Sequence, residues 1–191
     1  MCGISGIVHS ENIGRDLFNT IRNLEYRGYD SCGMAMLRQG VLDLRKNVGG
    51  IDDVNSLEKL DRMQGSIGIA HTRWATHGGV TKENAHPHLS PNKQFVIVHN
   101  GIISNYQELR GRLLSQGVVF ESLTDTEVFV NLLEESYSNN NDIEQAFLTV
   151  LEQIEGSFSI VMLSVHDPEH LYCVKKESPL LLGLGEGCNY V

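Results

Sequence analysis

Hydrophobic positions in the first third of the chain follow two different periods. Over residues 3–10 apolar residues alternate with small ones, which is typical of a buried strand, whereas over residues 14–25 they recur at helical spacing. The Gln39–Gly40 pair separates two apolar runs within residues 32–46 and predicts a hairpin. The same pattern predicts a short helix over residues 52–63 and a strand over residues 66–74.

Polar residues dominate positions 75–94, which include two prolines. This composition predicts a long polar loop, and a loop of that length inside a compact domain often has a functional role. An apolar strand follows over residues 94–101. We expect it to stop at Asn100–Gly101, because this pair commonly forms turns.

Three helices are predicted after that strand, the first two from capping signals. Ser104 begins an S-x-x-Q capping box, and the helix that it opens can end at Gly117. Thr124 begins a second box, T-x-x-E, at the start of the next helix. The third helix is expected over residues 142–156.

The last part of the chain is predicted to form strands over residues 157–165, 171–176 and 180–185, with a turn at Asp167–Pro168. The predicted strands come in hairpin-joined groups and do not alternate strictly with helices. This order favours an antiparallel α+β domain over a doubly wound parallel one. A chain of 191 residues is long enough to bury a substantial core.

Composition narrows the possible partners. The chain has 24 acidic and 15 basic residues, a formal net charge of −9, and no basic cluster longer than Lys175–Lys176. Nucleic-acid binding needs clustered basic residues, so we expect no nucleic-acid partner. No apolar run reaches the ~18 to 20 residues of a membrane helix, and no signal-peptide pattern is present. We therefore expect no membrane partner and a cytoplasmic location.

Two candidate motifs fit their patterns poorly. The sequence GLGEGC at residues 183–188 has a cysteine where a dinucleotide-binding loop has its third glycine, and no helical pattern follows it. His86 and His88 could ligate a metal ion together, but no third ligand follows at a typical spacing. We expect no metal and no cofactor.

Cys2 differs from the other cysteines because removal of Met1 would leave a thiol and a free α-amino group on one residue. Such an amine has a pKa of roughly 7.7 to 8.0, so near neutral pH part of the population can accept the thiol proton. The alternative is that Cys2 is an incidental terminal residue. Cys32 and Cys173 lie within predicted strands and are expected to be core residues, and the absence of C-x-x-C argues against a disulfide framework.

Other residues could complete a site around Cys2. Asn100–Gly101 could offer a side-chain amide and a backbone N–H to an oxyanion, although the pair taken alone fits an ordinary turn better. Arg73 suits a carboxylate, and Asp125, in the first turn of a capped helix, suits either an amine or the helix dipole. Trp74 could be a lid or a surface anchor. Together these residues describe a site for an amino acid with an amide side chain.

Six motifs follow one another along the chain: MCGISGIV, LEYRGYDSCGMA, GIAHTRWATHG, NAHPH, VHNGIISNY and TDTEV. In this order they resemble the class II glutamine amidotransferases, which are N-terminal nucleophile hydrolases. YRGYDS and HTRWATHG are most similar to the branch whose ammonia converts fructose 6-phosphate into glucosamine 6-phosphate. The resemblance runs from residue 2 to about residue 187.

The resemblance implies a four-layer α-β-β-α sandwich of two antiparallel sheets, and it assigns roles to residues. It implies that Cys2 attacks the side-chain amide of L-glutamine with its own amine as general base, while Asn100 and Gly101 form the oxyanion hole. The other implied site residues are Arg73, Thr76 and His77 around the substrate α-carboxylate, Asp125 at its α-ammonium, Trp74 and His86 on the closing loop, and Arg27 as support.

The resemblance also implies a larger enzyme. In the family, ammonia passes to a second domain with a sugar-phosphate isomerase unit, and the whole enzyme is a homo-oligomer. We expect residues 1–191 to be one glutaminase domain, cut short at its C-terminal end and lacking the isomerase domain. The alternatives are the glutaminase domain of an amidophosphoribosyltransferase and a non-catalytic binding module of the same fold.

Overall fold

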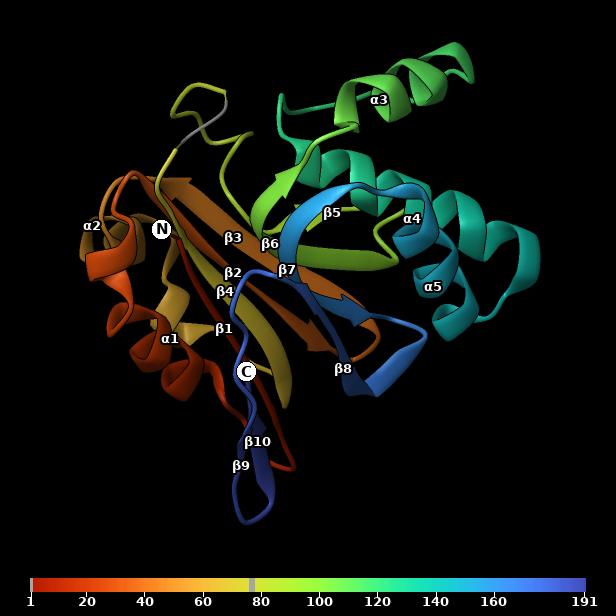
Figure 1. The fold of residues 1–191 in the computed structure, drawn as a ribbon. Helices are drawn as coiled ribbons and strands as arrows, with labels where there is room; N and C mark the ends of the chain where they lie inside the picture. The colour runs from red at the N-terminus through yellow and green to blue at the C-terminus, as the bar shows by residue number, and fades with distance from the viewer. Residues whose placement is uncertain (1, 76–77) are drawn as a thin grey trace.

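The computed structural model describes residues 2–75 and 78–191, and they fold into four layers (Figure 1). Two sheets face each other in the middle. Helices α1 (Gly14–Arg22) and α2 (Ile51–Glu58) cover the outer face of one sheet, and α4 (Asp125–Asn140) and α5 (Ile143–Gln153) cover the other. This arrangement confirms the α+β class and the α-β-β-α sandwich.

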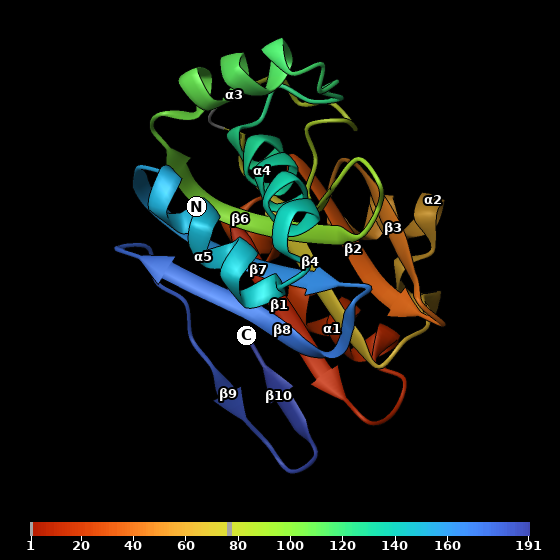
Figure 2. The same ribbon diagram turned by 90° about the vertical axis from the view of Figure 1, so that its right-hand side faces the viewer.

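All pairings between the described strands are antiparallel. The six-stranded sheet consists, in spatial order, of β3 (Val41–Val48), β2 (Ser31–Arg38), β4 (Ile67–Arg73), β1 (Gly3–His9), β10 (Cys188–Tyr190) and β9 (Gly183–Leu184). The four-stranded sheet consists of β5 (His88–Leu89), β6 (Phe95–Ile103), β7 (Gly156–Ser164) and β8 (Asp167–Lys176). Figure 2 shows the β9–β10 hairpin extending away from the body of the domain.

Apolar side chains fill all three spaces between the layers. One cluster lies between the six-stranded sheet and α1 and α2, and a second lies between the four-stranded sheet and the helices that cover it. The third lies between the two sheets and contains Ile69 of β4, Val98 of β6 and Val161 of β7. Burial on both faces explains why these strands are apolar along almost their whole length.

Strand alternation decides which residues meet between the sheets, because successive side chains point to opposite faces. On β4, Ile67 and Ile69 face the four-stranded sheet, so Arg73 at the end of the strand faces it as well. On β6, Val96 and Val98 face the six-stranded sheet, which places Asn100 on the same side. The register Gly3↔Thr72 brings the start of β1 beside the end of β4.

The prediction that β6 stops at Asn100–Gly101 is wrong. The strand continues to Ile103, because Asn100 pairs with Ser159 and Gly101 pairs with Phe158 on β7. Gly101 has a φ of +118°, and a Cβ there would lie 2.0 Å from the Ser157 carbonyl oxygen. Glycine is therefore needed at this position to continue the strand, and not to turn it.

Two other local predictions also differ from the structure. Helix α3 (Tyr106–Ser115) begins after Asn105, so Asn105 and not Ser104 occupies the N-cap position. The Asn105 side chain makes no capping bond to the helix and instead bonds the backbone of Gln153 and Glu155. The turn expected at Asp167–Pro168 lies two residues earlier, and these residues begin β8. An edge strand tolerates a proline because one side of its backbone has no partner strand.

The T-x-x-E signal is confirmed in part. Thr124 is the N-cap of α4, and its hydroxyl accepts a hydrogen bond from the Glu127 N–H at 3.3 Å. The Glu127 carboxylate does not return to Thr124, because it accepts from the backbone N–H groups of Glu121 and Ser122. The 75–94 segment is polar, as predicted, but residues 84–90 within it are largely buried and include β5.

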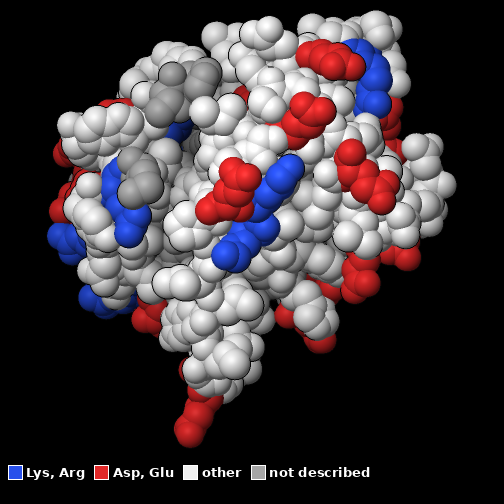
Figure 3. Space-filling view, in the orientation of Figure 1, with Lys and Arg blue, Asp and Glu red and all other residues white. Residues whose placement is uncertain are grey.

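The charges on the surface and the lengths of the helices bear on nucleic-acid and membrane partners. On the face shown in Figure 3, Lys and Arg side chains lie among Asp and Glu side chains. Among the helices of the described residues, none combines the length and the apolar character that would let it cross a bilayer.

Candidate active site

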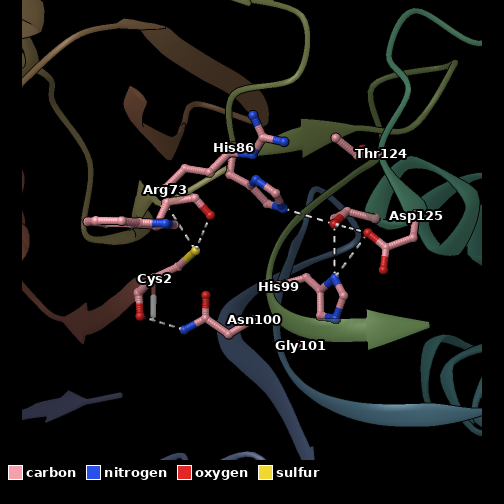
Figure 4. A pocket seen from close by; sticks show the side chains of 10 residues that line it. Cys2, Arg73, His86, His99, Asn100, Gly101, Thr124 and Asp125 are labelled. Atoms are coloured by element: carbon pink, nitrogen blue, oxygen red, sulfur yellow. Dashed lines mark hydrogen bonds and ion pairs between the residues drawn. The ribbon is translucent and has the colours of Figure 1, made fainter. Parts of the chain in front are cut away.

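A pocket opens at one end of the space between the sheets, where β1, β4 and β6 meet the start of α4 (Figure 4). It is lined by Cys2, Arg73, Trp74, His86, His99, Asn100, Gly101, Thr124, Asp125 and Thr126. Of the remaining predicted site residues, Arg27 lines a neighbouring hollow together with Cys2 and Trp74. The prediction for Thr76 and His77 lies outside the described residues, as does the state of Met1.

Cys2 lies directly before β1, at the edge of the pocket. Its Sγ accepts a hydrogen bond from the Trp74 N–H at 3.2 Å, and the Trp74 carbonyl oxygen lies 3.6 Å from the same sulfur. A Cβ on the next residue, Gly3, would lie 2.8 Å from both the Leu24 Cβ and the Thr72 hydroxyl oxygen. The Cys-Gly sequence therefore lets the chain pack closely against β4 while the thiol reaches the pocket.

Asn100 lies opposite Cys2, across the gap between the sheets. Its Nδ2 donates to the Cys2 carbonyl oxygen at 3.0 Å, and its Oδ1 lies 2.9 Å from Nε2 of His71 on β4. The side-chain amide therefore presents its N–H face to the residue that carries the thiol. An amide N–H in this position can stabilise an oxyanion formed by attack of the sulfur.

Arg73 is the last residue of β4, and its side chain is buried. Its Nη1 donates to the Gly79 carbonyl oxygen at 3.3 Å. Burial lowers the pKa of the guanidinium, while the nearby Cys2, Asp30 and Asp125 act in the opposite direction. A guanidinium keeps its charge at neutral pH and binds a carboxylate in a bidentate manner, which makes Arg73 suitable for the anionic end of an amino acid.

Asp30 fixes the backbone beyond Arg73. Its N–H donates to the Arg73 carbonyl oxygen at 3.1 Å, and its Oδ2 accepts from the Ala75 N–H at 2.8 Å. Between these two contacts the indole of Trp74 packs against Tyr29 with ring centroids 5.3 Å apart. The motif YRGYDS thereby holds the start of the loop that follows β4.

The N-terminus of α4 supplies the opposite wall of the pocket. Asp125 is the first helical residue after the Thr124 cap, and its Oδ2 accepts from the Ile103 N–H at 2.8 Å. This position is favourable for a carboxylate because of the helix dipole. The second oxygen, Oδ1, faces Thr126 and His99 at 3.5 Å and 3.8 Å and completes a site that suits an ammonium group.

Two buried histidines share one hydroxyl beside Asp125. Nε2 of His86 and Nδ1 of His99 each lie 2.9 Å from the Thr126 Oγ1. The hydroxyl has one hydrogen and two lone pairs, so it can accept from both rings and donate to the Asp125 Oδ1, which lies 3.5 Å away. Burial lowers the pKa of both imidazoles, and the Asp125 carboxylate partly offsets this effect at His99. Both rings are therefore neutral at neutral pH.

Lys46 of β3 holds the loop that carries His86 through hydrogen bonds to the loop backbone. The Lys46 ammonium donates to the carbonyl oxygens of Ala85 at 2.6 Å and of Glu83 and Pro87 at 3.1 Å each. Burial lowers the pKa of this amine to about 8. The position of His86 thus depends on a cation that the motif NAHPH gives no reason to expect.

The structure gives the histidines partners other than a metal ion. His86 bonds Thr126, and Nε2 of His88 lies 3.2 Å from the Thr124 hydroxyl oxygen. Among the described residues, no group of three or more His, Cys, Asp and Glu side chains is arranged to hold a metal ion.

Besides Lys46, sequence reasoning missed three residues of this arrangement: His71, His99 and Thr126. The two histidines belong to a conspicuous group of five within residues 71–99. The alternation of β6 could have separated Asn100, which faces the other sheet, from His99, which faces α4. The contact between His71 and Asn100 could not have been found in this way, because it joins strands of different sheets.

The chain is similar to known amidotransferase sequences. The profile of the glutamine amidotransferase domain matches residues 71–187. Proteins named glutamine–fructose-6-phosphate aminotransferase (isomerizing) are 44% identical in Pyrococcus horikoshii, 45% in Zymomonas mobilis and 44% in Staphylococcus aureus strain Mu50. These alignments cover 98%, 100% and 100% of this chain, which spans 31%, 31% and 32% of the three relatives.

Solved structures share the fold. The glutamine phosphoribosylpyrophosphate amidotransferase of Bacillus subtilis aligns with a TM-score of 0.85 at 22% identity, over 100% of this chain and 41% of that one. A class-II glutamine aminotransferase domain protein of Silicibacter pomeroyi aligns with a TM-score of 0.64 at 13% identity, over 98% and 87% of the two chains. The sequence profile and these folds agree, and the chain belongs to the class II glutamine amidotransferase domains.

Proposed function

We propose that this chain hydrolyses L-glutamine to glutamate and ammonia, with Cys2 as the nucleophile after removal of Met1. One observation carries the proposal: Cys2, Asn100, Arg73 and Asp125 line the same pocket from different elements of the fold. The Cys2 thiol can attack the amide carbon, and the Asn100 amide can stabilise the oxyanion that forms. Arg73 and Asp125 can bind the charged carboxylate and ammonium groups of a free amino acid.

The α-amine of Cys2 would accept the thiol proton, and the thiolate would attack the side-chain carbonyl carbon of glutamine. Asn100 Nδ2 and the Gly101 N–H would stabilise the tetrahedral oxyanion. The same amine, now protonated, would give its proton to the leaving nitrogen, which departs as ammonia and leaves a thioester. Water, deprotonated by the amine, would then attack the thioester to give glutamate and restore the thiol.

Substrate recognition would rest on two charged residues. Arg73 would bind the α-carboxylate, with Thr76 and His77 beside it, and Asp125 would bind the α-ammonium. We propose that Trp74 and His86 limit access of water to this pocket, since both line it and Trp74 opens the loop after β4. Arg27 lines the adjoining hollow together with Cys2, and from there it would help to hold Cys2 in place.

We further propose that the ammonia serves a synthase domain that converts fructose 6-phosphate to glucosamine 6-phosphate. The names of the relatives at 44 to 45% identity support this acceptor, as does the fact that this chain spans about a third of their length. In that setting residues 1–191 would be the glutaminase part of a longer, homo-oligomeric enzyme acting in the cytoplasm.

The proposal is tested by turnover in the intact protein freed of Met1. We expect glutamate and ammonia in equal amounts from glutamine and much slower release from asparagine, whose shorter side chain leaves its amide away from the thiol. The absence of glutamine hydrolysis in correctly processed protein would favour a non-catalytic module. In the presence of acceptors, fructose 6-phosphate should be aminated and phosphoribosyl pyrophosphate should not; the reverse result would assign the chain to an amidophosphoribosyltransferase.

A further inference from the structure

Asn100 can serve as an oxyanion donor in only one of the two orientations of its amide. Oxygen and nitrogen differ little in size, so rotation by half a turn would place the Oδ1 lone pairs where the oxyanion forms. Stabilisation of the oxyanion therefore requires a contact that distinguishes the two ends of this side chain.

We propose that His71, which lies in the strand behind the pocket, is the positioning residue that holds the Asn100 amide with its N–H face toward Cys2. The inference rests on the proposed role of Asn100 in glutamine hydrolysis. It adds a residue that does not line the pocket and would not touch substrate.

The tautomer of His71 follows from a backbone atom. Its Nε2 lies 3.2 Å from the His99 carbonyl oxygen and 2.9 Å from the Asn100 side chain. A carbonyl oxygen only accepts, so Nε2 must carry the hydrogen. The Asn100 atom that meets this N–H must then be the acceptor Oδ1, which directs Nδ2 toward Cys2.

The remaining contact of the amide agrees with this orientation. Nδ2 donates to the Cys2 carbonyl oxygen at 3.0 Å, and because Nδ2 carries two hydrogens, one is left for an oxyanion. His71 is thus one of two contacts, at opposite ends of the amide, that favour the same orientation. The His71 contact lies away from the reacting atoms and would persist while the tetrahedral intermediate forms.

The surroundings of His71 keep its ring in place. The side chain is fully buried, and it stacks on His86 with ring centroids 4.2 Å apart and an interplanar angle of 23°. Its Nδ1 has no hydrogen-bond partner among the described residues. Burial lowers the pKa of this histidine to about 3, so at neutral pH the ring is neutral and keeps its single N–H on Nε2.

Two substitutions of His71 separate positioning from packing. His71→Gln places an amide N–H near the position of Nε2, whereas His71→Met fills similar space without a donor. Removal of one oxyanion donor costs about 10²- to 10³-fold in kcat, and loss of its orientation should cost part of that. We expect His71→Met to lower kcat for glutamine hydrolysis about 10-fold or more with KM nearly unchanged, and His71→Gln to recover most of the loss.

Ile69→Ala is the matched control. Ile69 lies two residues away on the same face of β4, is fully buried, and packs in the apolar cluster between the sheets. It should lower the melting temperature of the intact protein and leave kcat unchanged. If Ile69→Ala lowers kcat as much as His71→Met does, or if His71→Gln is no better than His71→Met, the loss comes from packing and the inference is wrong.

A double-mutant cycle with Asn100→Ala distinguishes this inference from the proposed function. If His71 acts through Asn100, His71→Met should cause no further loss of kcat once Asn100 is alanine. Losses that multiply would overturn the inference. If Asn100→Ala alone leaves kcat unchanged, the proposed oxyanion role fails; if only His71→Met leaves kcat unchanged, the inference alone fails.

A measurement on the unmodified protein keeps the inference testable should the His71 variants not fold. Nitrogen NMR of the imidazole rings should find His71 neutral, protonated at Nε2 and without titration between pH 5 and 9. A hydrogen on Nδ1, or an ordinary histidine titration, would contradict it.

Discussion

The pocket has two walls that are held in place by different means. The strand wall consists of Cys2, Arg73, Asn100 and Gly101, which lie at or beside the ends of β1, β4 and β6. The helix wall consists of Thr124, Asp125 and Thr126 at the start of α4, with His86 against them. Ladder pairing of the strands fixes the positions in the first wall, whereas side-chain hydrogen bonds and a helix cap fix those in the second.

This difference suggests a division of work. The strand wall carries the groups proposed to react or to stabilise reacting atoms, together with Arg73, and small displacements there cost catalysis. The helix wall carries Asp125, which is proposed to bind only the unreactive end of the substrate. We therefore expect changes at the reacting groups of the strand wall to lower kcat and changes in the helix wall to raise KM.

The largest expected effect is at Cys2. Cys2→Ala removes the proposed nucleophile and should lower turnover by about 10⁴-fold or more, while glutamine still binds to Arg73 and Asp125. Cys32→Ala is the matched control, because this thiol is buried in the core and its burial raises the pKa to about 12. Equal activity of Cys2→Ala and the unmodified protein, measured as ammonia released, would contradict the assignment.

The next effect concerns the backbone of the strand wall. Gly101→Ala forces a Cβ to within 2.0 Å of the Ser157 carbonyl oxygen, so β6 and β7 must separate or the chain must fail to fold. We expect a lower melting temperature and a fall in kcat of about 10²-fold, similar to loss of an oxyanion donor. The control is Gly111→Ala in α3, where a Cβ meets nothing and helix propensity should add about 0.5 to 1 kcal/mol of stability.

Asp125→Asn tests the helix wall directly. The amide oxygen can still accept from the Ile103 N–H, but the charge proposed to bind the α-ammonium is lost. A hydrogen bond to a charged group contributes about 1.5 to 3 kcal/mol, so KM for glutamine should rise about 10- to 100-fold with kcat nearly unchanged. A fall in kcat at unchanged KM would show that Asp125 acts on the chemical step instead.

Acid should destabilise the folded domain through the buried histidines beside the pocket. Burial holds the pKa of His71 at about 3 and lowers the pKa values of His86 and His88, against an unfolded value near 6.5. Below pH 6.5 the unfolded chain binds more protons than the folded chain. The stability contributed by keeping these rings neutral is therefore present above pH 6.5 and is lost as pH falls, by about 1.4 kcal/mol per pH unit for each ring.

Urea unfolding at a series of pH values measures this slope. Substitution of His88 by glutamine should reduce it, because one of the buried rings that must become charged is gone. A free energy of unfolding that stays flat between pH 6.5 and 5 would contradict the neutral, buried state of the histidines.

The smallest expected effect compares two helix caps. Thr124 caps α4 at the pocket and Asp142 caps α5 away from it, where its Oδ1 accepts from the Gln145 N–H at 3.0 Å. Substitution of either residue by alanine should cost about 1 kcal/mol of stability. Only Thr124→Ala should also raise KM, by a few-fold, because Asp125 follows it. Equal KM values for the two variants would show that the cap does not position Asp125.

Sequence periodicity predicted most of the elements because burial sets the pattern of both sheets and helices. Periodicity placed the strand that holds Asn100, and local turn and capping signals placed the hairpin at Gln39–Gly40 and the cap at Thr124. It failed at Asn100–Gly101, where pairing with β7 overrides the turn preference of the pair, and at Ser104, where the neighbouring Asn105 makes contacts with residues far along the chain.

The residues of the site also divide into those that the sequence could predict and those that it could not. Cys2, Arg73, Asn100 and Asp125 could be proposed from residue type and from resemblance, because each carries a distinct chemical group. His71, Thr126 and Lys46 act through contacts between residues at least 27 positions apart, which no local pattern encodes. The fold brings them together by placing β4 beside β6 and by holding the loop before β5 against β3 and α4.

The account depends on one terminal residue that supplies both the sulfur that attacks and the amine that takes its proton. A diazoketone analogue of glutamine, followed by peptide mass spectrometry, tests this most directly. In protein that has lost Met1, a single covalent adduct should be found on the Cys2 sulfur, and an excess of glutamine should protect it. Protein that keeps Met1 should not react; an adduct on another residue, or no adduct on processed protein, would contradict the mechanism.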